Sequence, residues 1–395
     1  MSTPAILPGS AGTGQQTLLG VMGGGQLGRM FVHAAQRMGY GTAVLDPDVL
    51  SPAGLVSHHH IQTDYLDAQG LAQLMQRCAA ITTEFENVPA PALLTLGAQR
   101  PVAPAAESVA IAQDRIKEKA HFVRCGVPCA PYAVLQAEAD LAAVADALLP
   151  GILKTARLGY DGRGQVRVRN RAELAQAWHS LQGVSCVLEQ LLPLQAELSV
   201  IVARGWDGTL VHYPPQANLH RDGILAVTTA HEGNLPSALV QQAVEATESI
   251  ANGLRYVGVL CVEFFVLQGG ALVVNEMAPR PHNSGHYTID ACDVSQFELQ
   301  VRTLTGLPLA VPRQHSPAIM LNLLGELWRQ GSPDFAQLLA LPGVHLHLYG
   351  KLQAKPGRKM GHLTLTAATV TELQAKARAA CQILGIEPLP DWKAP

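Results

Sequence analysis

No apolar run in this sequence of 395 residues approaches the roughly 20 residues that a membrane-spanning helix needs. The 7 cysteines are scattered without a C-x-x-C pair, a pattern typical of reduced thiols in a cytoplasmic protein. The formal net charge is only −3, so neither nucleic acid nor an anionic membrane is expected as a partner. No G-K-[S/T] step precedes a predicted helix, which excludes a Walker A phosphate loop.

The composition is that of a folded chain, with 48% hydrophobic and 15% charged residues, and the length allows two or three domains. Between residues 17 and 46 an apolar strand, an amphipathic helix and a second strand form a βαβ unit, which predicts an open α/β sheet. The first sixteen residues lack the features of a signal peptide and are expected to be a flexible extension. Changes in composition divide the chain into four predicted parts: 1–16, 17–112, 113–311 and 312–395.

The stretch GVMGGGQLGRM ends the first predicted strand and opens the first helix. Gly23, Gly25 and Gly28 fit the pattern G-x-G-x-x-G, and Asp46 follows where an acid that binds a ribose would lie. Such a pattern alone is weak evidence for a dinucleotide, because glycine loops also approach other ligands. NAD and a different substrate both remain open as ligands of this loop.

Two apolar runs flank Gly269-Gly270, a pair that predicts a β-hairpin with a two-residue turn. In that register Gln268 pairs with Ala271, and Glu263 lies directly opposite Glu276. Two carboxylates that face each other in an apolar setting repel, and a divalent cation between them, typically Mg²⁺ with nucleotide phosphates, removes the repulsion. The alternative is a pair that points to solvent or forms salt bridges with arginine.

The stretch LGYDGRGQ, residues 158–165, contains three glycines and follows Lys154. A glycine-rich loop between two strands can close over phosphates with its backbone N–H groups, and the lysine supplies a point charge. Alone, such a hairpin is more often an ordinary tight turn. Together with the carboxylate hairpin it favours a nucleotide site.

Two other stretches are rich in donors for an anion. The loop APRPHNSGH follows the second carboxylate and suits an anionic substrate or an oxyanion, although it also resembles a capping loop. The stretch KLQAKPGRKMGH suits a substrate phosphate or is a solvated turn. By contrast, His58-His59-His60 and the pair His345 and His347 have no metal-ligand spacing and are interpreted as ordinary loop and strand residues. The donors of the loop APRPHNSGH are Arg280, His282, Asn283, Ser284 and His286. Those of the stretch KLQAKPGRKMGH are Lys351, Lys355, Arg358 and Lys359.

Seven motifs in this order resemble those of the 5-(carboxyamino)imidazole ribonucleotide synthases of the ATP-grasp superfamily. They are GGGQLGRM, TTEFENVP, LGYDGRGQ, NLHRDGI, NEMAPRPHNSGH, SQFELQVR and PGRKMGHL, and they cover nearly the whole chain from about residue 17. The resemblance implies α/β and α+β architecture: a Rossmann-like domain, an ATP-grasp domain with a mobile lid at about 150–210, and a small C-terminal domain. It implies ATP-dependent carboxylation of aminoimidazole ribonucleotide by bicarbonate, through carboxyphosphate, in a cytoplasmic homodimer. Mg²⁺ is the expected metal, with Mn²⁺ as an alternative, and no NAD is expected.

The resemblance also assigns residues. Glu263 and Glu276 would bind the metal, and Arg280, Asp161 and His282 would be catalytic, with the last two sharing the proton of the amine. The ATP site would comprise Arg115, Lys119, Lys154, Gly159, Tyr160, Asp161, Gly162, Arg163, Gly164, Gln165, Glu189, Gln190, Leu191, Leu192, Glu197, His220, Asn275 and Glu276. The ribonucleotide would meet Gln26, Leu27, Glu84, Tyr160, Arg163, Asn283, Ser284, Lys351 and Arg358.

One departure from the family pattern concerns the lid. Leu158 stands where a second consecutive glycine is expected, and a side chain there should stiffen one hinge. The nearest alternative function is that of the formate-using glycinamide ribonucleotide transformylases, although HNSG rather than HDTG favours the carboxylating enzymes. From other classes, an NAD-dependent oxidoreductase or a non-catalytic nucleotide sensor stays open.

Overall fold

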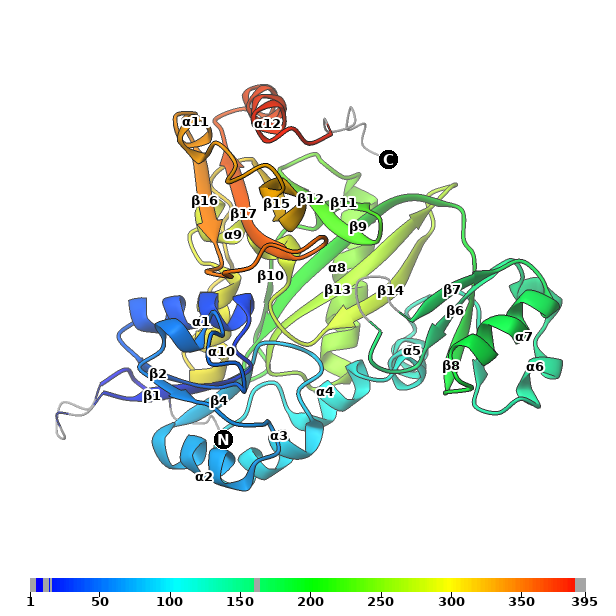
Figure 1. Ribbon diagram of the computed structural model, residues 1–395, viewed down its shortest axis with the longest axis horizontal. Helices are drawn as coiled ribbons and strands as arrows, with labels where there is room; N and C mark the ends of the chain where they lie inside the picture. Colours follow the sequence, from blue (N-terminus) through cyan, green and yellow to red (C-terminus); the bar gives the residue numbers. More distant parts are fainter. Residues whose placement is uncertain (1–4, 10–13, 15, 160–163, 388–395) are drawn as a thin grey trace.

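The structure is a computed structural model that describes residues 5–9, 14, 16–159 and 164–387 (Figure 1). Tyr160, Asp161, Gly162 and Arg163, all predicted site residues, lie outside the described residues. Among the described helices, none is both long and apolar enough to cross a membrane.

The N-terminal part contains a four-stranded parallel sheet in the order β3-β2-β1-β4. Both central strands are almost wholly buried because helices cover both faces of the sheet, as the continuous apolar runs predict. The glycine stretch connects the first strand to the first helix, so the predicted βαβ unit is confirmed. The elements are β1 (Leu18–Met22), α1 (Gln26–Arg37), β2 (Gly41–Leu45), β3 (His59–Ile61), α2 (Ala68–Arg77), β4 (Ala80–Thr83), α3 (Ala90–Gly97) and α4 (Ala106–Ala112).

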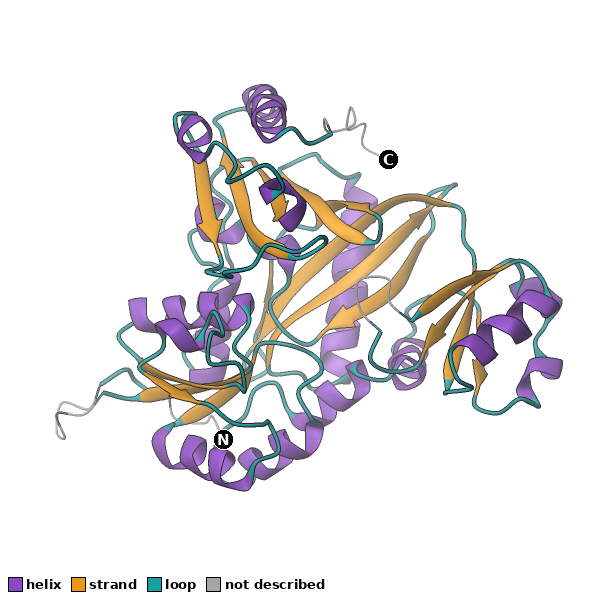
Figure 2. Ribbon diagram, in the orientation of Figure 1, coloured by secondary structure: helices purple, strands orange, loops and turns teal. Residues whose placement is uncertain are grey.

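A small four-stranded antiparallel sheet, in the order β5-β8-β6-β7, follows with its own apolar core. In Figure 1 it lies to one side of the large sheet, with α5 between the two, and Figure 2 shows α6 and α7 against it. This unit runs from residue 132 to 190, earlier in the chain than the lid expected at about 150–210. The elements are α5 (Arg115–Arg124), β5 (Tyr132–Leu135), α6 (Asp140–Ala143), β6 (Gly151–Thr155), β7 (Gln165–Val168), α7 (Arg171–Ser180) and β8 (Cys186–Gln190).

The largest layer is a nine-stranded antiparallel sheet in the order β14-β13-β9-β11-β12-β15-β17-β16, with β10 beside β9. Helices α8 and α10 pack on β9 and β13; the apolar residues of α8 are buried in one core there, and Leu299 of α10 in another. The elements up to residue 305 are β9 (Leu194–Arg204), β10 (Leu210–His212), β11 (Gln216–Arg221), β12 (Ile224–Ala230), α8 (Ser237–Gly253), β13 (Gly258–Leu267), β14 (Leu272–Ala278), α9 (Thr288–Ala291) and α10 (Gln296–Thr305).

The C-terminal residues extend this large sheet instead of forming a separate one. Strand β15 pairs with β12 from Val227–Leu321 to Ala230–Ala318, so the part expected from residue 312 shares its hydrogen-bonded ladder with the central domain. The apolar core of this C-terminal part lies between its strands and α12, and it is separate from the core that α8 covers. The elements are β15 (Ala318–Leu324), α11 (Phe335–Leu339), β16 (Val344–Leu348), β17 (Lys359–Thr366) and α12 (Val370–Leu384).

Part of the expected flexible extension is attached to the fold. The N–H group of Ile6 donates to Thr305 O at 2.8 Å, and the buried Tyr40 hydroxyl donates to Ile6 O at 2.7 Å. Ile6 also packs against the core that α1 and α10 share. Residues 5–9 therefore contribute to the contact between the N-terminal and central parts.

Candidate active site

A cavity of about 990 Å³ opens between the N-terminal sheet, the small sheet and the large sheet. Most of the predicted site residues line it, although they come from distant parts of the sequence. Lys119, Gly164 and Ser284 do not, whereas the lining includes Gln26, Leu27, Glu84, Arg115, Lys154, Gly159, Gln165, Glu189, Gln190, Leu191, Leu192, Glu197, His220, Glu263, Asn275, Glu276, Arg280, His282, Asn283, Lys351 and Arg358.

Glu263 on β13 and Glu276 on β14 are directly opposite each other, as predicted. The turn, however, has three residues, because Leu267 N donates to Ala271 O at 2.8 Å and closes the loop 268–270. The ladder then shifts by one residue between Glu263 and Phe264. This β-bulge adds one residue to β14 and restores the predicted pairing. The expected two-residue turn is therefore wrong, while the opposition of the two carboxylates is confirmed.

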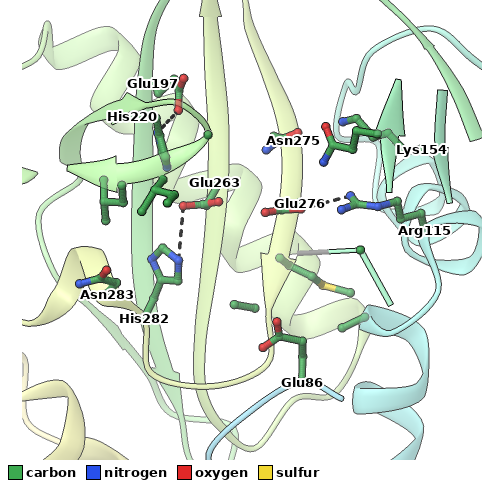
Figure 3. A pocket seen from close by; sticks show the side chains of 18 of the residues that line it. Glu86, Arg115, Lys154, Glu197, His220, Glu263, Asn275, Glu276, His282 and Asn283 are labelled. Carbon is green, nitrogen blue, oxygen red and sulfur yellow. Dashed lines mark hydrogen bonds and ion pairs between the residues drawn. The ribbon is translucent and has the colours of Figure 1, made fainter. Parts of the chain in front are cut away.

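The two carboxylates differ in their electrostatic surroundings. Burial and then the nearby Glu276 raise the pKa of Glu263 to about 8. Burial alone would also raise the pKa of Glu276, but Arg115, at 3.1 Å from its Oε2, and then Lys154 outweigh burial and lower it (Figure 3). One member of the pair therefore holds a proton near neutral pH, and the other carries the charge.

Three oxygen-bearing side chains meet at this point of the hairpin. The bulge lets Asn275 line the cavity next to Glu276, and Figure 3 shows both near Glu263. Within the described part of the chain, Glu263 Oε1 and Asn275 Oδ1 are buried and accept no hydrogen bond. Carboxylate and amide oxygens left without donors suit Mg²⁺. The residues present thus fit a divalent cation at this position.

Two lysines lie next to Glu189 at the edge of the cavity formed by the small sheet. Lys154 on β6 and Lys119 on α5 both pair with Glu189 on β8, at 3.0 and 3.2 Å. Lys119 is wholly buried and does not line the cavity, so in this structure it pairs with Glu189, and its expected contact with phosphates stays a prediction. Lys154 does line the cavity, and burial first of all lowers its pKa.

His282 faces Glu263 from the loop that follows β14. Its Nδ1 accepts the N–H group of Ser284 at 3.3 Å, which puts the proton of the neutral ring on Nε2. That Nε2 lies 3.5 Å from Glu263 Oε1 (Figure 3). Burial and then Arg280 depress the pKa of His282 well below its usual range. His282 is therefore neutral, with its Nε2–H near Glu263 Oε1 but not hydrogen-bonded to it, and its predicted part in the proton transfer stays a prediction.

The neighbouring Asn283 and Ser284 build this loop. The side-chain amide of Asn283 exchanges two hydrogen bonds with Asn322 on β15, at 3.0 and 2.7 Å. The Ser284 hydroxyl accepts from Ser199 at 2.8 Å and lies 2.9 Å from His282 Nδ1. Ser284 is fully buried and does not line the cavity, so this arrangement does not support its predicted contact with substrate. Asn283 still lines the cavity.

In the glycine stretch of the N-terminal domain, backbone N–H groups donate to carboxylates of the protein itself. The N–H groups of Gly25 and Gly28 donate to Glu84 at 2.9 and 3.1 Å, and that of Gly24 donates to Asp46 at 2.7 Å. Asp46 also accepts from the Tyr65 hydroxyl at 2.7 Å. These amides would bind a pyrophosphate and this acid a ribose in a dinucleotide site. The arrangement therefore gives no support to NAD.

Two glutamates that were not predicted from the sequence also shape the site: Glu118 is buried and Glu86 is partly buried. Glu86 pairs with Nε of Arg280 and so connects the N-terminal domain to the loop after β14. Glu118 on α5 accepts the N–H group of Met277 at 2.7 Å, immediately beside Glu276. Glu86 belongs to the motif TTEFENVP, so that motif could have identified it as a site residue. Glu118 comes from a helix with no motif.

A cluster of histidines lies apart from these carboxylates. Asp290, His347 and His362 each place one potential metal ligand within 4.8 Å of the others. His347 Nε2 already lies 2.8 Å from Asp290 Oδ2, and its ring stacks on that of His362 at 4.5 Å and 11°. Nearly parallel stacked rings direct their lone pairs along parallel lines, which do not converge on one ion. We interpret the cluster as packing.

Leu158 lines the cavity at the start of the glycine-rich stretch. It has φ +61° and a side chain that is 76% exposed. A left-handed leucine costs about 1–2 kcal/mol relative to glycine. The departure noted in the sequence thus lies at a position where the backbone favours glycine.

Three family models match consecutive parts of the chain. They are a ribonucleotide synthetase preATP-grasp domain over residues 16–113, an ATP-grasp domain over 120–297, and a phosphoribosylaminoimidazole carboxylase C-terminal domain over 318–376. Together they confirm the predicted fold class.

Curated relatives match over almost the full length. A Pseudomonas aeruginosa protein named N5-carboxyaminoimidazole ribonucleotide synthase is 43% identical over 359 residues, which is 91% of this chain and 97% of the relative. A Bacillus subtilis protein of the same name is 39% identical over 365 residues, with 92% and 93% covered.

Solved structures agree with these sequence matches. The Thermus thermophilus N5-carboxyaminoimidazole ribonucleotide synthetase has a TM-score of 0.86 at 36% identity, covering 94% of this chain and 100% of that one. The Aspergillus clavatus N5-carboxyaminoimidazole synthase, in complex with ADP and 5-aminoimidazole ribonucleotide, has a TM-score of 0.84 at 32% identity, with 93% and 98% covered.

Replacing Gly25 by alanine should destabilise the protein. The added Cβ would lie 2.5 Å from Glu84 Oε1, so the carboxylate that holds the glycine stretch must move. We expect a loss of about 1–3 kcal/mol in the free energy of unfolding, measured by denaturant titration. Gly97→Ala is the control, because its Cβ would meet only one atom, at 3.9 Å. Equal stability of the two variants would contradict the packing described.

The histidine cluster predicts a loss of stability in acid. Burial, followed by His286 and His347, depresses the pKa of His362 well below its usual value of about 6.5, so the folded protein keeps it neutral. The unfolded chain binds that proton as the pH falls below about 6.5, and stability then decreases. His362→Gln should recover about 1.5 kcal/mol of the loss between pH 6.5 and 5. The exposed His59→Gln should recover none, and an equal effect of both would refute this account.

Proposed function

This chain belongs to the N5-carboxyaminoimidazole ribonucleotide synthases, and from that premise we propose how its residues perform the reaction. The protein is an ATP-dependent ligase of purine biosynthesis that carboxylates 5-aminoimidazole ribonucleotide. The observation that carries the assignment of roles is the opposed pair Glu263 and Glu276, with the buried oxygen of Asn275 beside it.

ATP is proposed to lie between the small sheet and β14. Gln190 at the end of β8 and the following Leu191 and Leu192 line the cavity and would hold the adenine, while Glu197 would hold the ribose. Glu197 is paired with His220, which fixes its carboxylate (Figure 3).

The phosphates are proposed to lie among cations at the hairpin. Arg115 and Lys154 contribute fixed positive charge there. Glu263, Glu276 and Asn275 would hold Mg²⁺ or Mn²⁺. When bound, the metal neutralises phosphate charge. Because phosphoryl transfer requires mainly positioning and charge neutralisation, these groups suffice without a covalent role for the protein.

Bicarbonate is the proposed one-carbon substrate. Its oxygen attacks the γ-phosphorus of ATP, ADP leaves, and carboxyphosphate forms. Arg280, held by Glu86, and Nε2–H of His282 point donors toward this region and would stabilise the anions. The exocyclic amine then attacks the carboxyl carbon, phosphate leaves, and the amine loses a proton. Asp161, the predicted partner for that proton, lies outside the described residues.

The ribonucleotide is proposed to bind between the N-terminal and C-terminal parts. Gln26, Leu27 and Glu84 line one wall of the cavity, and Lys351 and Arg358 line another, where they suit its phosphate. Tyr160 and Arg163 remain predictions, as do the homodimer and the cytoplasmic location.

The alternative activities differ in what they leave unexplained. A formate-dependent glycinamide ribonucleotide transformylase would share the hairpin and the lid, but family membership argues against it. An NAD-dependent oxidoreductase would leave the carboxylate pair without a purpose. A nucleotide sensor would bind ATP without hydrolysing it, so a measurement of turnover distinguishes a sensor from the ligase.

The proposal predicts that ADP release from Mg²⁺ and ATP in bicarbonate buffer is stimulated by aminoimidazole ribonucleotide. Glu276→Ala should lose at least about 100-fold in kcat, since one oxygen ligand and one fixed charge disappear. A coupled assay for ADP measures both. Stimulation by glycinamide ribonucleotide with formate instead would assign the rival activity, and an unaffected Glu276→Ala would remove the hairpin from the reaction.

A further inference from the structure

The loop between β16 and β17 carries two cations at the ends of a tight turn. Arg358 N donates to Lys355 O at 3.0 Å, with Pro356 and Gly357 between them. Gly357 has φ +72°, which the third position of a type II turn requires, and proline is favoured at the second position. The cations that line the cavity here are Lys351, Lys355, Arg358 and Lys359.

This turn rests on the 3₁₀ turn Gly325–Trp328 that follows β15. The two meet because β15 and β17 are antiparallel neighbours, so residues after one lie beside residues before the other. Gly325 N donates to Arg358 O at 2.9 Å. A Cβ on Gly325 would lie 2.1 Å from Lys355 O, so the two backbones touch. A side chain makes the third contact, because Glu326 Oε1 accepts the N–H group of Gly357 at 2.6 Å.

The contact of Glu326 is a charge-assisted hydrogen bond to the centre of the turn. Such bonds are shorter and stronger than those between neutral groups. In the described chain its second oxygen, Oε2, is buried and accepts no hydrogen bond, so the carboxylate is committed to this one contact. Without it the turn would keep its own internal bond, the backbone contacts at Gly325 and the bond from Arg358 Nη1 to Gln353 O at 2.9 Å, but Gly357 would lose its hydrogen bond to a side chain.

We propose that Glu326 is a positioning residue for substrate phosphate: it fixes the turn 355–358 so that Lys355 and Arg358 stay directed at the end of the cavity where the ribonucleotide phosphate binds. This inference rests on the proposed function. A turn that is already fixed loses less conformational entropy when the phosphate arrives, so the effect is on ribonucleotide affinity. The proposed ATP site, between the small sheet and β14, does not include this turn, so ATP affinity should not change.

The test is the steady-state kinetics of Glu326→Ala and Glu326→Gln. The alanine variant should raise the KM for aminoimidazole ribonucleotide about tenfold, because a loosened turn must then be ordered when the phosphate binds. Its kcat and its KM for ATP should stay at the wild-type values. The glutamine variant keeps an amide oxygen that can accept from Gly357, so most of the affinity should return. Hydrogen exchange at the Gly357 amide should be faster in the alanine variant alone.

Asp334→Ala is the matched control. Asp334 is also an acid of the C-terminal part that accepts a backbone N–H group, from Gln337 at 2.9 Å, but it lies outside the cavity. It should lower the melting temperature without a change in KM for the ribonucleotide. An equal rise of this KM in Asp334→Ala would reduce the role of Glu326 to general stability and overturn the proposal.

Two further results would overturn it. One is a normal KM for the ribonucleotide in Glu326→Ala, and the other is a glutamine variant as defective as the alanine variant. Failure of the proposed function looks different, because the wild type itself would then show no stimulation of ADP release by the ribonucleotide. The hydrogen-exchange comparison at Gly357 still tests the contact in that case.

Discussion

Glu263 and Glu276 lie directly opposite each other on β13 and β14, and the charges placed around them balance their mutual repulsion. Arg115 and Lys154 stabilise the ionised form of Glu276, while Glu263 takes a raised pKa. The bulge at Asn275 brings a third oxygen to the same place without adding charge. The proposed cation would replace a proton here and gain three oxygens, and it would bring nucleotide phosphate to a position that the fold already fixes.

A second constraint recurs in the walls of the cavity. Three buried or half-buried glutamates each accept backbone N–H groups from a segment that lines the cavity: a loop, an edge strand and a tight turn. Glu84 holds the glycine stretch, Glu118 holds the outer edge of β14, and Glu326 holds the turn before β17. At the glycine stretch, the carboxylate of Glu84 accepts the backbone N–H groups that would hold an anionic ligand in a dinucleotide loop.

The sequence indicated the architecture and most of the cavity, and the failures have identifiable physical causes. The opposition of Glu263 and Glu276 was predicted from a two-residue turn. The turn is one residue longer, and the β-bulge shifts the register back by one residue, so the pairing is the same. No local pattern in the sequence reveals either change. Lys119 and Ser284 were placed at the ligands, yet tertiary packing directs both toward other side chains. The addition of β15 to the large sheet depends on long-range pairing, which composition does not encode.

The central claim is that a divalent cation relieves the carboxylate pair. Its most direct test is the melting temperature of the wild type and of Glu263→Gln with a saturating non-hydrolysable ATP analogue, as Mg²⁺ is varied. The account predicts a rise with Mg²⁺ for the wild type only, and a variant no less stable than the wild type when Mg²⁺ is absent. A parallel rise in both proteins, or a variant that melts lower without Mg²⁺, would contradict it.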